Sequence, residues 1–283
     1  MTKTLADGAL AGKNVWITGG GTGLGRAMAL RFAELGARVG LSGRRVEPLE
    51  ETRDTIVAAG GMAAIAPCDV RRSKQVGEAH AALSASLGPL DGLINNAAGN
   101  FLCPAEELSD GGFKVIVDIV LQGTFYCTRQ CGQDWIASGR PGSILNILTP
   151  YAWTGSAYVM PSAAAKAGVL AMMRSLTAEW GRHDIRLNGI APGPIPTEGA
   201  FSRLLPSDEL LKNVIAKIPA GRLGKPEELA ELAAFLFSPA ADWIRGEVIT
   251  LDGGEVIRRS GSFNDLVDLP AEQWELLRQA AKR

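Results

Sequence analysis

A run of glycines lies between a predicted strand at residues 13–18 and a predicted helix at residues 23–36. The run reads Thr18, Gly19, Gly20, Gly21, Thr22, Gly23, Leu24 and Gly25. Because glycine lacks a Cβ atom, a diphosphate can approach bare backbone there, and the following helix offers amide hydrogens to it. Without further context, such a run of glycines could instead serve only to let the backbone make a tight turn. Its place between a strand and a helix favours a dinucleotide site.

Two arginines follow the next predicted strand, at residues 37–42. An acidic side chain at this strand end would bind the ribose 2′-hydroxyl of NAD and repel a 2′-phosphate. The chain instead offers Arg44 and Arg45, whose guanidinium groups suit bidentate contact with phosphate. NADP(H) is therefore the predicted cofactor, with Arg44 at its phosphate. The alternative is a solvated pair of surface charges.

Strands and helices alternate along the chain, and this alternation predicts the frame that positions these residues. Strands are predicted near residues 13–18, 37–42, 62–67, 90–95, 142–148, 185–190 and 247–251, and helices near 23–36, 46–59, 73–87, 105–138, 158–181 and 226–238. Right-handed crossovers then imply an α/β protein with a single Rossmann-type, doubly wound parallel sheet and helices on both faces. No linker or repeat divides residues 1–283, so we expect one domain.

Composition and charge weigh against several classes of function. The net charge is −1 and no basic cluster with interleaved aromatics occurs, so we expect no nucleic-acid partner. No apolar run approaches the roughly 18 residues that span a bilayer, and no signal, transit or peroxisomal sequence is recognised, so we expect a cytoplasmic protein without a membrane partner. Four cysteines and two histidines lack metal-ligand spacing, so we expect reduced thiols and no metal.

The glycine run fits the pattern Thr-Gly-x-x-x-Gly-x-Gly, which resembles the motif of the short-chain dehydrogenase/reductase family. Asp69 and Val70, after the third predicted strand, resemble the family's Asp-Val pair, in which the aspartate receives the adenine amino group; Asp69 could instead cap a helix. Asn96 lies in a segment that resembles the family's Asn-Asn-Ala-Gly. The resemblance implies further cofactor contacts from Pro192, Gly193, Pro194, Ile195 and Thr197.

The sequence departs from the family pattern where catalysis is expected. Most members place a catalytic tyrosine four residues before a lysine, but Ser162 stands four residues before Lys166. Thr149 occupies the usual serine position, and Val120 replaces an asparagine that supports a proton relay. Tyr158, eight residues before Lys166, fits neither this pattern nor the Tyr-x6-Lys spacing of enoyl-acyl-carrier reductases.

Tyr151 lies fifteen residues before Lys166, and this spacing resembles the 2,4-dienoyl-CoA reductase branch of the family. The resemblance implies NADPH-dependent reduction of 2,4-dienoyl-CoA to 3-enoyl-CoA in unsaturated fatty acid β-oxidation. Tyr151 and Asn100 would donate hydrogen bonds to the thioester oxygen as it gains charge. Lys166 would hold the nicotinamide ribose, and Ser162 would support Lys166 or a water. Tyr151 could alternatively be a loop tyrosine that packs on the core, and Asn100 a turn former.

The same resemblance implies where the acyl-CoA substrate binds. The substrate residues would be Arg44, Arg71, Asn100, Phe101, Ser109 and Arg203. A lid is expected near residues 197–220 and a C-terminal extension near 255–283. Taken singly, Arg71 and Arg203 would more often be solvated surface charges.

A homotetramer is expected from the two long apolar helices at residues 105–138 and 158–181, through which family members commonly pair. Their apolar residues exceed what one sheet face is expected to cover, and they include Ile116, Ile119, Val120, Leu170 and Met173. Two other functions stay open from sequence. One is a carbonyl or 3-ketoacyl-type reductase with a relocated tyrosine, and the other is a catalytically silent NADPH-binding scaffold.

Overall fold

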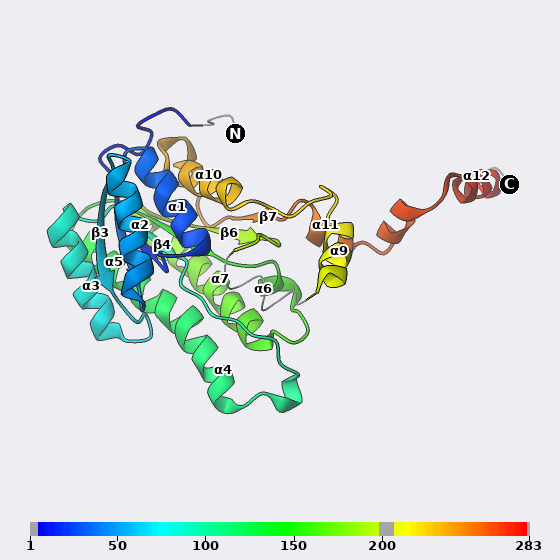
Figure 1. Cartoon of the computed structure of the whole chain (residues 1–283), viewed down its shortest axis with the longest axis horizontal. Coiled ribbons are helices and arrows are strands. Elements are labelled where there is room, and N and C mark those ends of the chain that lie inside the picture. Colours follow the sequence, from blue (N-terminus) through cyan, green and yellow to red (C-terminus); the bar gives the residue numbers. More distant parts are fainter. Residues whose placement is uncertain (1–4, 198–206, 282–283) are drawn as a thin grey trace.

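Seven strands form one parallel sheet in the computed structural model, which describes residues 5–197 and 207–281 (Figure 1). The strands are β1 (Asn14–Thr18), β2 (Arg38–Gly43), β3 (Met62–Pro67), β4 (Gly92–Asn95), β5 (Gly142–Ile147), β6 (Ile185–Pro192) and β7 (Val248–Leu251). Their order is β3-β2-β1-β4-β5-β6-β7, and all neighbours are parallel. The predicted fold class is confirmed. The order reverses between β1 and β4, which opens a crevice at their carboxyl ends.

Helices cover both faces of the sheet. On one face lie α1 (Gly23–Glu34), α2 (Val46–Ala58) and α10 (Pro226–Phe237), which share one buried apolar cluster. On the other face, α3 (Ser73–Leu87), α5 (Gly123–Ser138) and α7 (Met160–Trp180) share a second cluster. Each helix turns an apolar stripe toward the sheet, so the inner strands β1, β4, β5 and β6 are buried on both sides, while the edge strands β3 and β7 are only partly buried.

The helix expected over residues 105–138 begins at Asp110 and contains a π-helical turn. A 3₁₀ turn at Ala105–Glu107 is followed by α4 (Asp110–Val117), a π-helical turn at Asp118–Gln122, and then α5. The Ser109 hydroxyl accepts a hydrogen bond from the Gly112 amide at 3.1 Å, which caps α4 and fixes its start. The π turn adds a residue to one turn, so a single 3.6-residue period cannot describe the segment.

The apolar residues that motivated the tetramer also need correction. Ile116, Val120, Leu170 and Met173 are buried in the second cluster of their own chain, and Ile119 packs against it. They therefore do not form an exposed surface for a second subunit.

Several short elements follow the strands and were not predicted. They are α6 (Tyr151–Thr154), α9 (Asp208–Ala216), α11 (Glu255–Ser260) and α12 (Ala271–Ala280), with 3₁₀ turns at Gly181–His183, Pro239–Ala241 and Asn264–Asp268. Residues 198–206 of the expected lid lie outside the described residues. The helix α12 projects away from the body in Figure 1, and all its residues are exposed. Within the described residues, no helix has both the length and the apolarity to cross a membrane.

Candidate active site

The turn between β1 and α1 leaves no room for side chains. A Cβ atom on Gly25 would lie 2.1 Å from the carbonyl oxygen of Gly19 and 2.6 Å from Nδ2 of Asn96. Gly23 has a φ of +53°, and a Cβ there would lie 3.3 Å from the side chain of Thr197. The predicted glycine loop and the segment after β6 therefore meet at the carboxyl edge of the sheet.

Asn96 holds this turn in place. Its Nδ2 donates hydrogen bonds to the carbonyl oxygens of Thr18 and Gly19 at 3.0 and 3.2 Å. The Thr18 hydroxyl donates to the Ile94 carbonyl and accepts from the Asn96 amide. No described side chain caps the N-terminus of α1. A rigid cradle of bare backbone beside uncapped helix amides fits the diphosphate of a dinucleotide.

Charged residues follow β2 and β3. The guanidinium of Arg71 donates to both carboxylate oxygens of Asp69, with the shortest contact at 2.5 Å, and these hydrogen bonds are the main cause that lowers the pKa of Asp69. Arg44, exposed at the end of β2, adds a smaller contribution through its charge. The Val70 side chain is buried against Gly123, where a Cβ would lie 2.7 Å from it. Asp69 and Arg71, predicted for different ligands, thus hold each other.

Three predicted catalytic side chains meet after β4 and β5. Nδ2 of Asn100 donates to the Tyr151 hydroxyl at 3.4 Å, and the hydroxyls of Tyr151 and Ser162 lie 3.2 Å apart. Tyr151 opens the short helix α6, while Ser162 lies in the first turn of α7. Oδ1 of Asn100 accepts from the Phe101 amide at 3.0 Å, which fixes the orientation of its amide. Ser162, expected to support Lys166 or a water, also contacts the Tyr151 hydroxyl, a contact that was not predicted.

Lys166 is buried one turn further along α7. Its Nζ donates to the carbonyl oxygen of Ile147 at the end of β5, and burial lowers its pKa to about 8. The fully buried Val120 in the π turn offers no side-chain acceptor. This amine is therefore held by backbone alone in the described structure.

Two further predicted substrate residues lie near the start of α4. The Phe101 ring and the Ser109 hydroxyl are each 3.3 Å from the position that a Cβ atom on Gly112 would take. Arg203 lies outside the described residues. Tyr158 is 61% exposed and has a φ of +64°, so its phenol is not held with Tyr151.

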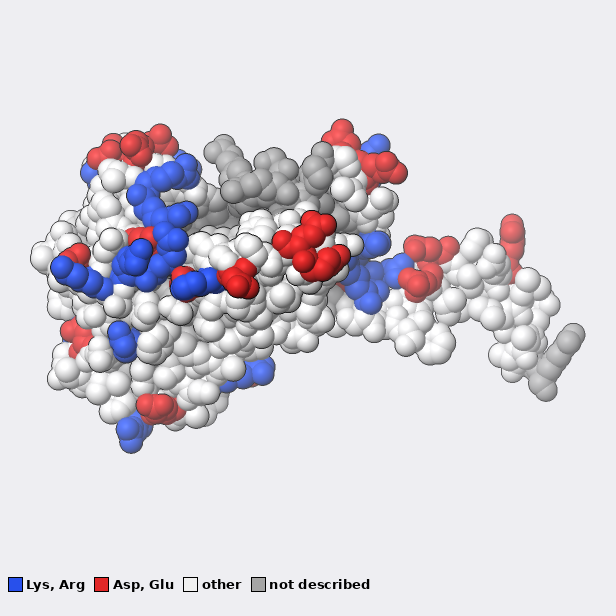
Figure 2. All heavy atoms as spheres, turned by 90° about the horizontal axis from the view of Figure 1, so that it is seen from below, with Lys and Arg blue, Asp and Glu red and all other residues white. Residues whose placement is uncertain are grey.

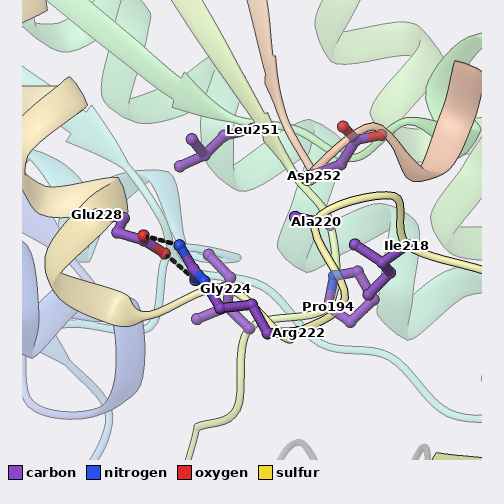
Figure 3. A pocket seen from close by; sticks show the side chains of 11 residues that line it. Pro194, Ile218, Ala220, Arg222, Gly224, Glu228, Leu251 and Asp252 are labelled. Atoms are coloured by element: carbon purple, nitrogen blue, oxygen red, sulfur yellow. Dashed lines mark hydrogen bonds and ion pairs between the residues drawn. The ribbon is translucent and has the colours of Figure 1, made fainter. Parts of the chain in front are cut away.

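A side pocket of about 180 Å³ lies behind the segment after β6, lined in part by Pro194, Ile218 and Asp252 (Figure 3). A Cβ on Gly193 would lie 2.7 Å from the Cβ of Asp252, so the segments after β6 and β7 touch. Asp252 Oδ1 accepts from the Gly254 amide at 2.8 Å. Sequence reasoning assigned no role to Asp252, although the Asp-Gly-Gly that directly follows a predicted strand was a signal for such a turn.

No group of three or more potential metal ligands gathers anywhere in residues 5–197 or 207–281. All four cysteines are free thiols, and burial raises the pKa of Cys68 to about 11. The polar groups of the site are thus the phenol, the amide, the hydroxyl and the amine described above.

A family model described as enoyl-(acyl carrier protein) reductase matches residues 19–255. The chain is also 44% identical to a short-chain dehydrogenase from Bacillus anthracis, whose crystal structure superposes with a TM-score of 0.81 and covers 90% of this chain and 100% of that one. The chain belongs to the short-chain dehydrogenase/reductase family. It is therefore an oxidoreductase of a family that uses nicotinamide cofactors.

Two curated members of the family resemble the chain along most of its length. A probable 2,4-dienoyl-CoA reductase of Bacillus subtilis, named as producing (2E)-enoyl-CoA, is 47% identical over 86% of this chain and 96% of its own. A probable 2,4-dienoyl-CoA reductase of Caenorhabditis elegans, named as producing (3E)-enoyl-CoA, is 41% identical over 91% of this chain and 85% of its own. The predicted resemblance to this branch is confirmed.

Proposed function

We propose that the protein reduces 2,4-dienoyl-CoA thioesters with NADPH. The observation that carries the proposal is the contact of Asn100, Tyr151 and Ser162 at the carboxyl edge of the sheet. Two hydrogen-bond donors, one phenolic and one amide, converge there beside a cradle that suits a dinucleotide. They are fixed before substrate arrives, as stabilisation of a developing oxyanion requires.

The donors match the charge that the reaction creates. NADPH, when bound, supplies the hydride, which adds to the far end of the conjugated diene. Electron density then moves to the thioester oxygen, and Tyr151 and Asn100 donate hydrogen bonds to it. Because Oδ1 of Asn100 accepts from the Phe101 amide, the amide hydrogens face the phenol side. Protonation at the α-carbon completes the proposed reduction to 3-enoyl-CoA.

The neighbours of Tyr151 favour this reaction over ketone reduction. A ketone needs a general acid that protonates the carbonyl oxygen as hydride arrives, usually a tyrosine relayed through the lysine. Here the Tyr151 hydroxyl contacts Ser162, while Lys166 donates to the Ile147 carbonyl. Lys166 is left to hold the nicotinamide ribose, and Ser162 positions the phenol.

The remaining predicted residues divide between the two ligands. The turn after β1, Arg44, Asp69 and the segment after β6 would bind NADPH. Acyl-CoA would contact Phe101 and Ser109 near the reacting carbons and Arg71 at its anionic tail. The charge of Arg44 near Asp69 supports NADPH over NADH, since a 2′-phosphate would be drawn to this strand end.

The deciding experiment measures NADPH oxidation in parallel with a 2,4-dienoyl-CoA, a 2-enoyl-CoA and a 3-ketoacyl-CoA. We expect fast oxidation with the dienoyl thioester alone, and NMR of the product should place its double bond at C3. Faster reduction of the ketoacyl thioester would favour the relocated-tyrosine reductase instead. Binding of NADPH without oxidation in any of the three would favour the silent scaffold.

A further inference from the structure

The chain ends in an arm, residues 261–281, that stands clear of the body. The arm consists of the 3₁₀ turn at Asn264–Asp268 and the helix α12, and α11 joins it to β7. Neither the turn nor α12 contains a buried residue. Figure 1 and Figure 2 view the molecule at right angles to each other, and in both the arm points away from the sheet and its helices.

Contacts at the root of the arm fix its direction. The guanidinium of Arg258, in α11, donates to the carboxylates of Asp265 and Asp268 at 3.2 and 2.8 Å. Nδ2 of Asn264 donates to the Arg258 carbonyl oxygen at 3.1 Å. The helix α11 is held in turn by Asp252, whose Oδ2 accepts from a backbone amide in the first turn of α11 at 2.7 Å. The arm must therefore break these contacts before it can fold back on its own body.

The arm carries large apolar side chains in exposed positions. Phe263 is 79%, Val267 is 71% and Leu276 is 65% exposed. Trp274 and Leu277 are also exposed, and their spacing of three residues places them on one side of α12. A helix of only ten residues is marginally stable in water without tertiary contacts. The arm therefore needs a surface on which to pack.

A second uncovered surface lies on the body, at the edge of the sheet. No strand in residues 5–197 or 207–281 pairs with the outer side of β7, and proteins normally cover such an edge. Trp243, five residues before β7, is 96% exposed, although tryptophan is usually among the well-buried residues. Its position is fixed, because the carbonyl oxygen of Ile244 accepts from Nδ2 of Asn188 at 2.6 Å.

We propose that the arm of one chain packs on Trp243 of a second copy, and that the two copies exchange arms about a two-fold axis beside β7. Trp243 precedes the amino end of β7, and the arm follows its carboxyl end. Two β7 strands that lie antiparallel across such an axis bring Trp243 of each copy beside the arm of the other. The same surface then serves both copies, so the exchange is closed.

Charge and size favour a second copy over a membrane as the partner of the arm. Amphipathic helices that lie on membranes carry mainly Lys and Arg on their polar face. The helix α12 instead carries Glu272 and Glu275 with a single arginine, Arg278. A standard protein interface takes about 20 to 30 residues from each partner. The arm together with Trp243 and the edge of β7 reaches this size in each copy.

Photo-crosslinking tests the contact in the full chain, with p-benzoylphenylalanine in place of Trp243. An intermolecular link doubles the chain mass of 29.8 kDa on a denaturing gel, whereas a link within one chain leaves it unchanged. We expect the doubled mass, and mass spectrometry of the linked peptides should place the second end of the link in residues 261–281. A link within one chain, a link to another segment, or no link would overturn the exchange.

Light scattering tests whether the contact holds two copies together. Leu277→Glu and Trp243→Glu should each halve the mass of the native assembly, because the new carboxylate would be buried without a partner. Gln279→Glu is the matched control, since it places the same carboxylate on the polar face of α12 and should leave the mass unchanged. Circular dichroism should give the native spectrum for all three variants, because the three side chains are exposed in the single chain.

Three results would contradict the exchange. One is a native mass equal to that of a single chain, and another is a native mass retained by both Leu277→Glu and Trp243→Glu. The third is sedimentation of the native chain with phosphatidylglycerol vesicles that Leu277→Glu abolishes while the assembly mass stays the same. That result would assign the arm to a membrane surface instead of a second copy.

Discussion

The Tyr151 hydroxyl contacts Asn100 and Ser162, and it shares its proposed role with Asn100 but not with Ser162. Tyr151 and Asn100 are proposed to donate hydrogen bonds to the thioester oxygen. Removing either donor should therefore raise the energy of the transition state more than that of the bound substrate. Removal of one aimed donor typically lowers turnover by about a hundredfold or more. Tyr151→Phe and Asn100→Ala should each do so with a dienoyl-CoA, in steady-state assays, while NADPH affinity stays unchanged.

Tyr158→Phe is the control for this prediction, because the Tyr158 side chain is exposed and should not matter. Ser162→Ala should have a smaller effect than Tyr151→Phe, since Ser162 positions the phenol without donating to substrate. Near-native turnover by Tyr151→Phe, with loss of turnover by Ser162→Ala, would require a serine-lysine mechanism instead.

We predict that the preference for NADPH over NADH depends on Arg44. A charge-assisted bond to the 2′-phosphate is available to NADPH and not to NADH. Arg44→Ala should therefore raise the Kd of NADPH by about tenfold or more and leave that of NADH nearly unchanged, as measured by fluorescence titration. Equal affinities of the native protein for the two cofactors would contradict the assignment.

Lys166 makes stability depend on pH, because burial lowers its pKa from 10.5 to about 8. Below pH 8 both the folded and the unfolded chain carry this proton. Between pH 8 and 10.5 the folded chain releases it while the unfolded chain retains it, so the free energy of unfolding rises with pH. The rise is at most about 1.4 kcal/mol per pH unit.

Urea denaturation without cofactor at pH 7.5 and 9.5 tests this expectation. Lys166→Met removes the titrating group, so the wild type should gain stability relative to the variant by about 1 to 2 kcal/mol at the higher pH. A difference between the two proteins that does not change with pH would show that Lys166 keeps its ordinary pKa.

At the scale of elements, the turn between β1 and α1 is the most constrained part of the site. Gly25→Ala would place a Cβ atom 2.1 Å from the Gly19 carbonyl oxygen, so the backbone must shift. We expect this substitution to abolish NADPH binding and to lower the free energy of unfolding by about 1 to 3 kcal/mol.

The control is Gly77→Ala in α3, where the nearest atom would be Oε1 of Gln130 at 3.6 Å. A helix gains about 0.5 to 1 kcal/mol from this exchange, so the variant should be slightly more stable and bind NADPH normally. Equal effects of the two substitutions in calorimetric melting and binding assays would contradict a special role for the turn.

The strands and the cradle were predictable because buried parallel strands and glycine turns are encoded locally. The π turn inside the helical run of residues 110–138 was not predictable, because it leaves no trace in an apolar period. Nor could spacing along the chain reveal that Ser162 contacts Tyr151, eleven residues away on another helix. The Asp69–Arg71 pair is local, but which partner a carboxylate chooses depends on side-chain geometry that no pattern encodes.

For the whole molecule, the expected tetramer needs a surface other than the buried residues of α4 and α7. We propose that two exposed aromatics on α4 and α5 form part of it: Phe113 is 38% and Phe125 is 40% exposed. Arg129 lies over the Phe125 ring at 5.0 Å, which keeps the ring in place on the helix surface. Aromatic side chains with a neighbouring arginine are typical of the centre of a subunit interface.

Light scattering at micromolar concentration should therefore give four times the chain mass of 29.8 kDa. Phe125→Asp should dissociate the assembly, because a carboxylate at the interface centre would be desolvated without a partner. Val57→Asp replaces an apolar side chain, 53% exposed, on α2 at the other face of the sheet, and it should leave the mass unchanged. A monomeric mass for the native chain would refute the tetramer. A tetrameric mass for Phe125→Asp would show that the subunit interface does not include this part of α5.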